Sequence, residues 1–250
     1  MAKKRVSLTL DKDIVERIDS EADRRDVNRS QMMERITESY FNQRGLDTAV
    51  VLCGDERLRS LELYNGKPVL SHILDHLSEE GFNRIILLIG QNFRIREEFG
   101  SEYRDLALEY LEEEEPEGTA VALRKVKDKV EKDFAVLNGH VITDVDMQEM
   151  LRFHTEKEVA ATMALTTVEE PSDYGVARLK GSTIQGFVEK PETGDEPSRL
   201  INAGTYILSP EIFSDLEEDS LEEAFERLAE ASKLAGYIYG GDWTEMESGN

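Results

Sequence analysis

The sequence has one cysteine, no long apolar segment and few lysines. Because Cys53 is the only thiol, a disulfide framework and a cysteine-rich zinc site are excluded. The longest apolar run, Ile85 to Gly90, is far shorter than the roughly 20 residues that span a bilayer. No charged-then-apolar signal segment opens the chain. These absences predict a soluble cytoplasmic protein with no membrane partner.

Acidic residues dominate the charge: 53 Asp and Glu stand against 30 Lys and Arg, a net charge of −23. With 39% hydrophobic residues in periodic segments, the chain is not a disordered acidic one. Only 12 of the 30 cations are lysines. Dispersed carboxylates with few lysines suit molar salt, where the Debye length is about 3 Å. We therefore expect a halophilic archaeal source, with an ordinary acidic protein as the alternative.

The charge is also unevenly distributed along the chain. Residues 1–44 hold 10 basic and 9 acidic residues, a net charge of +1, whereas residues 45–250 hold 20 and 44, a net charge of −24. Such asymmetry indicates two modules with different partners. We place their boundaries at 1–44 and 48–250.

The first module reads as a short strand and two helices. Val6, Leu8 and Leu10 alternate with the polar residues Arg5, Ser7 and Thr9, which is strand periodicity. Asp11 is positioned to cap a first helix, and Asn28 with Gln31 forms a capping-box pattern that opens a second helix, ended by Gly45. A lone strand has unpaired edges, and about 44 residues bury too little apolar surface to be stable alone. Two copies are therefore expected to pair their strands in a homodimer.

Two segments of this module, Lys4–Leu10 and Asn28–Gln31, resemble the ribbon-helix-helix DNA-binding proteins of the CopG type, over residues 3–41. The resemblance implies that double-stranded DNA is a partner, because a two-stranded ribbon fits the major groove and the start of a helix suits a phosphate. A module that only dimerises is the alternative. The candidate DNA-binding residues are Arg5, Ser7 and Thr9 on the strand and Asn28, Arg29 and Ser30 at the helix start.

The second module shows short apolar runs separated by segments of helical spacing. Strands that alternate with helices predict an α/β fold with a mostly parallel, doubly wound sheet, whose ligands bind beyond the carboxyl ends of the strands. The predicted strands are 49–52, 85–89, 134–137 and 160–165, and the clearest helices are 69–77 and 147–153.

A series of segments in this module resembles, in order, the sugar-phosphate nucleotidyltransferases, over about residues 48–245. The segments are Gly66–Leu70, Gly118–Ala120, Asn138–Asp144, Asp173–Gly175, Gly186–Pro191, Ile201–Tyr206 and Trp243–Glu247. The resemblance implies that a nucleotide or a sugar phosphate binds, as a substrate or an effector. The residues that it marks are Lys67 and Lys190 for phosphate, Gly118 and Thr119 near the nucleotide, and Glu189, Asn202 and Gly204 on the sugar side. The alternative for the glycines is that they serve turns.

Two departures from the family's pattern argue against catalysis. The loop Cys53–Arg59 keeps one glycine where the family has several, and it carries Asp55 and Glu56 where a triphosphate would approach. His140 stands where the family has a Mg²⁺-binding aspartate, and Mg²⁺ prefers oxygen ligands. We therefore assign no catalytic residue and expect no cofactor, with Mg²⁺ required only if the protein is an active enzyme.

Other possible metal ligands give weaker signals. Glu245 matches the family's second metal position, and Asp144 could join a metal site, although an Asp144–Asp146 pair after a strand more often caps the next helix. His72 and His76 are four residues apart, but no third ligand is evident, so a role on the helix surface is favoured.

The sequence alone thus favours a dimeric DNA-binding transcriptional regulator whose larger domain is a degenerate nucleotidyltransferase that senses a ligand or binds another protein. The alternative is an active, Mg²⁺-dependent sugar-phosphate nucleotidyltransferase that forms nucleoside-diphosphate sugars and uses the first module to dimerise. A third possibility is an antitoxin-like or scaffolding protein.

Overall fold

The chain forms two compact units, Met1–Gly45 and Leu46–Asn250, and each is described by itself. The computed structural model describes residues 6–25, 27–43 (for 38–43 the backbone alone), 45–55, 57–91, 93–112, 118–217 and 219–246.

The first unit is a pair of helices, α1 (Lys12–Arg24) and α2 (Arg29–Gln43). The predicted capping box is confirmed: Asn28 Oδ1 accepts from the backbone N–H of Gln31, and Gln31 Oε1 accepts from the N–H of Asn28, both at 3.0 Å. Arg29 joins the helices by donating two hydrogen bonds of 2.6 Å to Asp19. Buried apolar residues in the described part of this unit are few, namely Ile18, Ala22 and Met32.

The predicted strand at residues 6–10 is not present as a strand in the structure of this single chain. Val6 and Leu8 are 71% and 66% exposed, so the apolar face of the alternating segment has nothing to pack against. A strand needs a hydrogen-bonded neighbour, and no neighbour for this segment exists within the described chain. Arg5 lies outside the described residues. Asp11 does precede α1, but its side chain makes no capping hydrogen bond.

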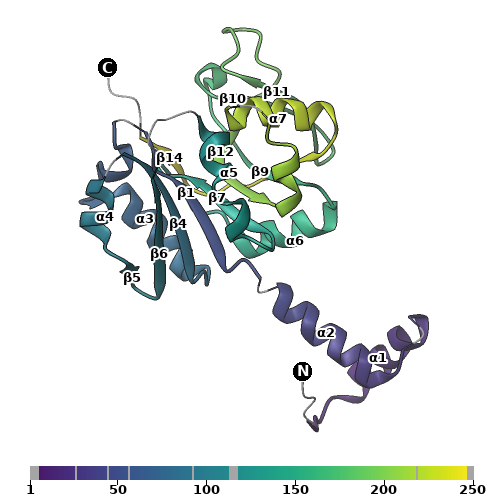
Figure 1. Ribbon diagram of the computed structural model, residues 1–250. Helices are drawn as coiled ribbons and strands as arrows, with labels where there is room; N and C mark the ends of the chain where they lie inside the picture. The colour runs from purple at the N-terminus through teal and green to yellow at the C-terminus, as the bar shows by residue number, and fades with distance from the viewer. Residues whose placement is uncertain are drawn as a thin grey trace. The chain divides into compact units, whose positions relative to one another are not determined.

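The second unit is built on a ten-stranded sheet in the order β10-β11-β13-β9-β12-β7-β1-β4-β6-β5 (Figure 1). The four predicted strands are confirmed as β1, β4, β7 and β9. Their bounds and those of the other strands of the sheet are β1 (Thr48–Leu52), β4 (Arg84–Gly90), β5 (Glu102–Tyr103), β6 (Leu106–Glu112), β7 (Phe134–Asn138), β9 (Ala161–Thr167), β10 (Gly175–Lys180), β11 (Thr183–Glu189), β12 (Leu200–Leu208) and β13 (Leu234–Ile238).

The sheet is mixed, which corrects the prediction of a mostly parallel one. Strands β7, β1, β4 and β6 run parallel, but β12 lies antiparallel to both β7 and β9, and β10 pairs antiparallel with β11. The parallel part follows the alternation of strand and helix in the first half of the module. Between β9 and β12 the chain instead forms the β10–β11 hairpin, and no α-helix connects these strands.

Helices cover both faces of the sheet, as a doubly wound fold requires (Figure 1). The helices are α3 (Val69–Glu79), α4 (Phe93–Phe99), α5 (Thr119–Arg124), α6 (Met147–Lys157) and α7 (Leu221–Glu230). Two short strand pairs, β2 (Leu63–Tyr64) with β3 (Lys67–Pro68) and β8 (Val141–Thr143) with β14 (Trp243–Glu245), lie outside the main sheet. Among the described residues, no helix has the length and apolar character to cross a membrane.

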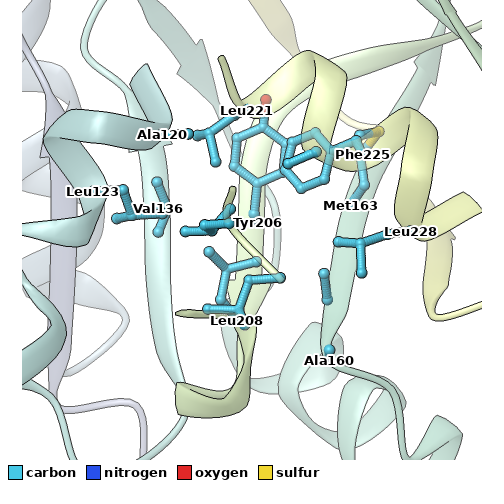
Figure 2. Packing of buried hydrophobic residues seen from close by; sticks show 14 of the residues in the cluster. Ala120, Leu123, Val136, Ala160, Met163, Tyr206, Leu208, Leu221, Phe225 and Leu228 are labelled. Carbon is cyan, nitrogen blue, oxygen red and sulfur yellow. The ribbon is translucent and has the colours of Figure 1, made fainter. Parts of the chain in front are cut away.

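Two apolar cores result, one on each face of the sheet. On one face Val136 and Tyr206 pack with residues of α5 and α7, including Leu123 and Phe225 (Figure 2). The Tyr206 and Phe225 rings lie 4.9 Å apart at their centroids. The other core packs alternate residues of the same strands, such as Leu137, against α3, α4 and α6. Alternation between two buried faces explains why the strands read as continuous apolar runs.

A buried histidine fastens α6 to the sheet. His154 is 2% exposed, its Nδ1 lies 2.8 Å from Thr162 Oγ1 on β9, and its Nε2 lies 2.9 Å from Ser209 Oγ just after β12. Burial lowers the pKa of His154, partly opposed by the nearby carboxylate of Asp133. The imidazole is therefore neutral in the folded protein near neutral pH.

We expect the contribution of His154 to the free energy of unfolding to decrease as the pH is lowered. Because its folded-state pKa is below the unfolded value of about 6.5, the unfolded chain binds the proton first. The contribution is therefore complete above pH 6.5 and is lost as the pH falls through the folded pKa. Urea unfolding of wild type and His154→Asn between pH 5 and 8 should show a steeper loss below pH 6.5 in wild type. Parallel curves would contradict this assignment.

Candidate functional site

A cleft of about 930 Å³ opens where strands β1 and β7 end. The loop after β1 lines one side and the turn after β7 lines the next, as expected for ligands of α/β sheets. Its volume is in the range of sites that enclose a small-molecule ligand. The described residues that line the cleft include Gly54, Asp55, Arg59, Gly118, Thr119, Asn138, His140, Asp173, Tyr174, Gly175, Glu189, Lys190, Asn202, Gly204, Glu222, Trp243 and Glu245.

The loop after β1 is organised by Asp55. Its Oδ1 accepts from the backbone N–H groups of Arg57 at 3.1 Å and Arg59 at 3.4 Å, and lies 3.6 Å from Arg59 Nε. Leu58, between these two arginines, has a positive φ of 55°. Asp55 therefore lines the cleft, as expected, and also bonds to its own loop. Glu56 lies outside the described residues.

Arg59 brings a fixed positive charge into the cleft. Its guanidinium lies between two carboxylates, with Nη1 3.9 Å from Glu245 Oε1, and donates to the carbonyl of Met246 at 3.4 Å. With a side chain only 17% exposed, Arg59 is held in one orientation. Arg59 and Lys190 are the two cations among the described residues that line the cleft.

His140 and Glu245 lie side by side in the cleft, with His140 Nε2 3.2 Å from Glu245 Oε1. Strand β14 brings them together, because Glu245 pairs with Val141 and the Met246 N–H donates to the His140 carbonyl at 2.9 Å. One carboxylate and one imidazole, already bonded to each other, do not form the oxygen-rich shell that Mg²⁺ prefers. Nor do any three His, Cys, Asp or Glu residues cluster as metal ligands among the described residues. This pair therefore does not fit a dedicated Mg²⁺ site.

Two more carboxylates, those of Glu189 and Glu222, line the cleft. The pKa of Glu189 is raised because the surrounding protein shields its carboxyl from water and because Glu222, Glu226 and Glu245 repel its charge, while Lys190 opposes the shift. Glu222 is in the first turn of α7, whose N-terminus is capped by Ser220. Lys190 has an unusual positive φ of 46°, and its N–H donates to the Tyr174 carbonyl at 3.0 Å.

The segment Asn202–Gly204 forms a tight, hydrogen-bonded part of the floor. Asn202 Nδ2 donates to the Tyr206 hydroxyl at 2.7 Å, and Asn202 Oδ1 accepts from the Gly204 N–H at 3.0 Å. Gly204 has a φ of +71°, and a Cβ there would lie 3.0 Å from Asn138 Nδ2. Glycine is therefore required here both for the backbone conformation and for the close approach of β7.

Thr119 and Gly118 link α5 to α7 at the cleft edge. Thr119 Oγ1 accepts from the Leu221 N–H at 2.9 Å, at the start of α7. A Cβ on Gly118 would lie 2.2 Å from the carbonyl oxygen of Asp219, so no larger residue fits. Both residues line the cleft while holding two helices together.

Several candidates from the sequence are not in the cleft. Lys67 Nζ instead pairs with Asp75 at 2.7 Å, and Asp144 lines a smaller, separate pocket. His72 and His76 bond to backbone carbonyls at 2.8 and 3.0 Å, consistent with a structural role. Asp146 caps α6, as expected, by accepting from the Glu149 N–H at 2.7 Å. In the first unit, Asn28 and Arg29 make the cap and the ion pair with Asp19, while Ser7, Thr9 and Ser30 are exposed.

Sequence reasoning missed two residues of the cleft. Arg59 lies in the loop Cys53–Arg59, but the sequence predicts no function for it. Its closeness to Glu245 depends on the pairing of β8 with β14, which the sequence does not reveal. Glu222 belongs to no noted segment. The one local signal near Glu222 is Ser220, a residue type that favours the start of a helix. Such a signal predicts where a helix begins, but it does not predict that this end of the helix lies at a cleft.

Two family models match the chain. Residues 52–245 match the model described as nucleotidyl transferase, and residues 4–43 match that of the ribbon-helix-helix protein, copG family. The second match covers the segment that contains α1 and α2.

Curated relatives of this chain are mannose-1-phosphate guanylyltransferases. A probable mannose-1-phosphate guanylyltransferase 2 from Oryza sativa subsp. japonica is 32% identical over 222 residues, 79% of this chain and 60% of that protein. A mannose-1-phosphate guanyltransferase from Yarrowia lipolytica is 34% identical over 209 residues, 76% of this chain and 57% of that protein. The chain thus spans about 60% of the length of such relatives.

Solved structures share the fold of the second unit. A putative glucose-1-phosphate thymidylyltransferase from Bacillus anthracis matches with a TM-score of 0.72 at 20% identity, over 79% of this chain and 89% of that one. HddC from Yersinia pseudotuberculosis, complexed with GMP-PN, matches with a TM-score of 0.67 at 22% identity, over 79% and 92%. At these identities the likeness shows the fold.

These relatives contradict the prediction of a transcriptional regulator with a degenerate second domain. An identity near 32% over most of the chain connects it to curated enzymes and favours the enzyme alternative. The prediction gave too much weight to the altered loop and to His140, whose surroundings local sequence does not reveal.

Gly175, which lines the cleft at the start of β10, offers a test of the site geometry. A Cβ on Gly175 would lie 2.3 Å from Phe187 Cζ and 2.7 Å from Glu189 Oε2. Gly175→Ala should therefore lower the free energy of unfolding by about 1–3 kcal/mol and displace Glu189. The matched control is Gly186→Ala, whose Cβ would have its nearest neighbour, Arg178 Nε, at 3.5 Å, an ordinary contact distance. In urea unfolding, the control should stay within about 1 kcal/mol of wild type. Equal effects would refute this account of the packing.

Proposed function

The chain belongs to the nucleotidyl transferase family, and we propose that it transfers a nucleotidyl group from a nucleoside triphosphate to a sugar 1-phosphate. An oxygen of the sugar phosphate attacks the α-phosphorus of the triphosphate, the bond to the β-phosphate breaks, and pyrophosphate leaves. The products are a nucleoside-diphosphate sugar and pyrophosphate. The names of the relatives make GTP and mannose 1-phosphate the first pair to test.

One observation carries this proposal: segments scattered over nearly 200 residues meet in one cleft. The loop after β1, Gly118–Thr119, Asn138–Val141, Asp173–Gly175, Glu189–Lys190, Asn202–Gly204 and Trp243–Glu245 all contribute to its lining. All but the loop after β1 belong to segments that carry the resemblance to sugar-phosphate nucleotidyltransferases. Their convergence is what a bisubstrate site needs, since both phosphates must reach one point.

The cations of the cleft suit the negative charge of the reaction. Arg59 and Lys190 would neutralise phosphate oxygens in a site otherwise rich in carboxylates. Glu189 and Glu222 would accept hydrogen bonds from sugar hydroxyls, because a carboxylate is an acceptor. Because His140 and Glu245 do not fit a dedicated Mg²⁺ site, Mg²⁺ would enter on the triphosphate as part of the substrate.

The proposed activity predicts pyrophosphate release from GTP and mannose 1-phosphate in the presence of MgCl₂. Coupled pyrophosphate detection should be run with other nucleoside triphosphates and other hexose 1-phosphates, from low to molar KCl. Lys190→Ala should reduce kcat/KM by about tenfold or more, since a charge-assisted hydrogen bond contributes roughly 1.5–3 kcal/mol. The absence of pyrophosphate with every pair, at every salt concentration, would overturn the proposal.

For the first unit we propose a role in forming a homodimer. Val6, Leu8 and Leu10 expose apolar side chains on one side of an alternating segment, and the described core of this unit is very small. Pairing of residues 6–10 from two copies would supply the missing strand neighbour and bury these side chains. The match to the copG family over residues 4–43 supports the same arrangement.

Dimer formation can be separated from general effects of charge. Leu8→Glu places a carboxylate on the apolar side and should weaken the dimer at least tenfold in sedimentation equilibrium. Thr9→Glu, on the polar side of the same segment, is the matched control and should leave the dimer intact. A monomeric wild type, or equal dissociation of both variants, would contradict the proposal.

A further inference from the structure

The loop after β1 has to hold its shape with a single glycine, Gly54. Loops that present backbone N–H groups to phosphates usually rely on several glycines, since these allow positive φ angles and a close approach. Here the turn contains Leu58 at a φ of 55°, a conformation that is unfavourable for a residue other than glycine. Some other interaction must therefore stabilise this loop.

Asp55 provides that interaction through one carboxylate oxygen. Its Oδ1 accepts from the N–H groups of Arg57 and Arg59, on both sides of Leu58, and lies 3.6 Å from Arg59 Nε. The Leu58 N–H adds a 3.2 Å bond to the Asp55 carbonyl. Asp55 thus contacts the loop at each residue from 57 to 59.

The same carboxylate also determines where Arg59 can point. Asp55 holds the backbone of Arg59 and one end of its guanidinium, while Glu245 and the Met246 carbonyl contact the other end. The second oxygen, Asp55 Oδ2, is buried and has no hydrogen-bond partner in the described structure. The contacts of the Asp55 carboxylate with the loop and with Arg59 are therefore made by Oδ1.

We propose that Asp55 is a positioning residue for the nucleotide: it replaces the missing loop glycines and holds Arg59 in place for the triphosphate. This inference rests on the proposed function. The opposite view, that the negative charge of Asp55 repels the nucleotide, predicts tighter binding when the charge is removed.

Two substitutions at this position distinguish these views. Asp55→Asn keeps an oxygen that can accept from both N–H groups but removes the charge, whereas Asp55→Ala removes the acceptor as well. We expect Asp55→Ala to raise the KM for GTP about tenfold or more, with a smaller change in kcat, and Asp55→Asn to stay within about threefold of wild type. Asp128→Asn, at an exposed position outside the cleft, controls for net charge.

A double-mutant cycle tests whether Asp55 acts through Arg59. If it does, Asp55→Ala should add little to the loss already caused by Arg59→Ala. Additive losses, or a KM for GTP that is unchanged or lower in Asp55→Ala, would overturn the proposal. Loss of GTP binding in Asp55→Asn equal to that in Asp55→Ala would overturn it as well.

Hydrogen–deuterium exchange keeps this test independent of turnover. The amides of Arg57 and Arg59 should exchange faster in Asp55→Ala than in wild type and Asp55→Asn, because their side-chain acceptor is gone. If wild type neither releases pyrophosphate nor binds GTP in calorimetry, the proposed function fails, and exchange alone decides whether Asp55 holds the loop. Unchanged exchange in Asp55→Ala would refute the loop assignment.

Discussion

The second unit depends on the burial of β1 between β7 and β4. All three strands run parallel and are covered by apolar cores on both faces, so they tolerate neither polar side chains nor a shift of register. Because β1 and β7 end at the same edge, the chain must leave the sheet there through two neighbouring loops. Those loops, after Leu52 and after Asn138, form the base of the cleft. The site is therefore a consequence of how the sheet is buried.

The balance of charge within the cleft is unusual for a site proposed to bind phosphates. Carboxylates outnumber the two cations, Arg59 and Lys190, among its described lining residues. The structure shows how this becomes tolerable: Asp55 is bonded to its own loop and Glu245 to His140. Repulsion between carboxylates remains at Glu189, whose pKa is raised by burial and by the charges of Glu222, Glu226 and Glu245. The acidity that marks residues 45–250 is thus organised within the site by local pairing.

The first unit shows the opposite situation, in which the fold is incomplete within one chain. Its two helices form as expected, and the capping box and the Asp19–Arg29 pair fix how they meet. Its alternating segment has no strand neighbour among the residues that the structure describes, and Val6 and Leu8 are exposed. A strand is defined by hydrogen bonds to another strand, and a pattern in one copy cannot supply them. The alternating segment at residues 6–10 is amphipathic, as predicted, but it forms no strand in the single chain.

The sequence by itself determined the local elements and the family. Apolar runs located β1, β4, β7 and β9, because burial on both faces of a sheet leaves a continuous hydrophobic signal. Short motifs around Asn138, Glu189 and Asn202 indicated sugar-phosphate nucleotidyltransferases, and the relatives agree. Tertiary structure alone decided the antiparallel place of β12, the approach of Glu222 from α7, and the meeting of Arg59 with Glu245, 186 residues further along the chain. The physical reason is that charge pairing and strand order depend on contacts between distant segments, which leave no periodic trace in either segment.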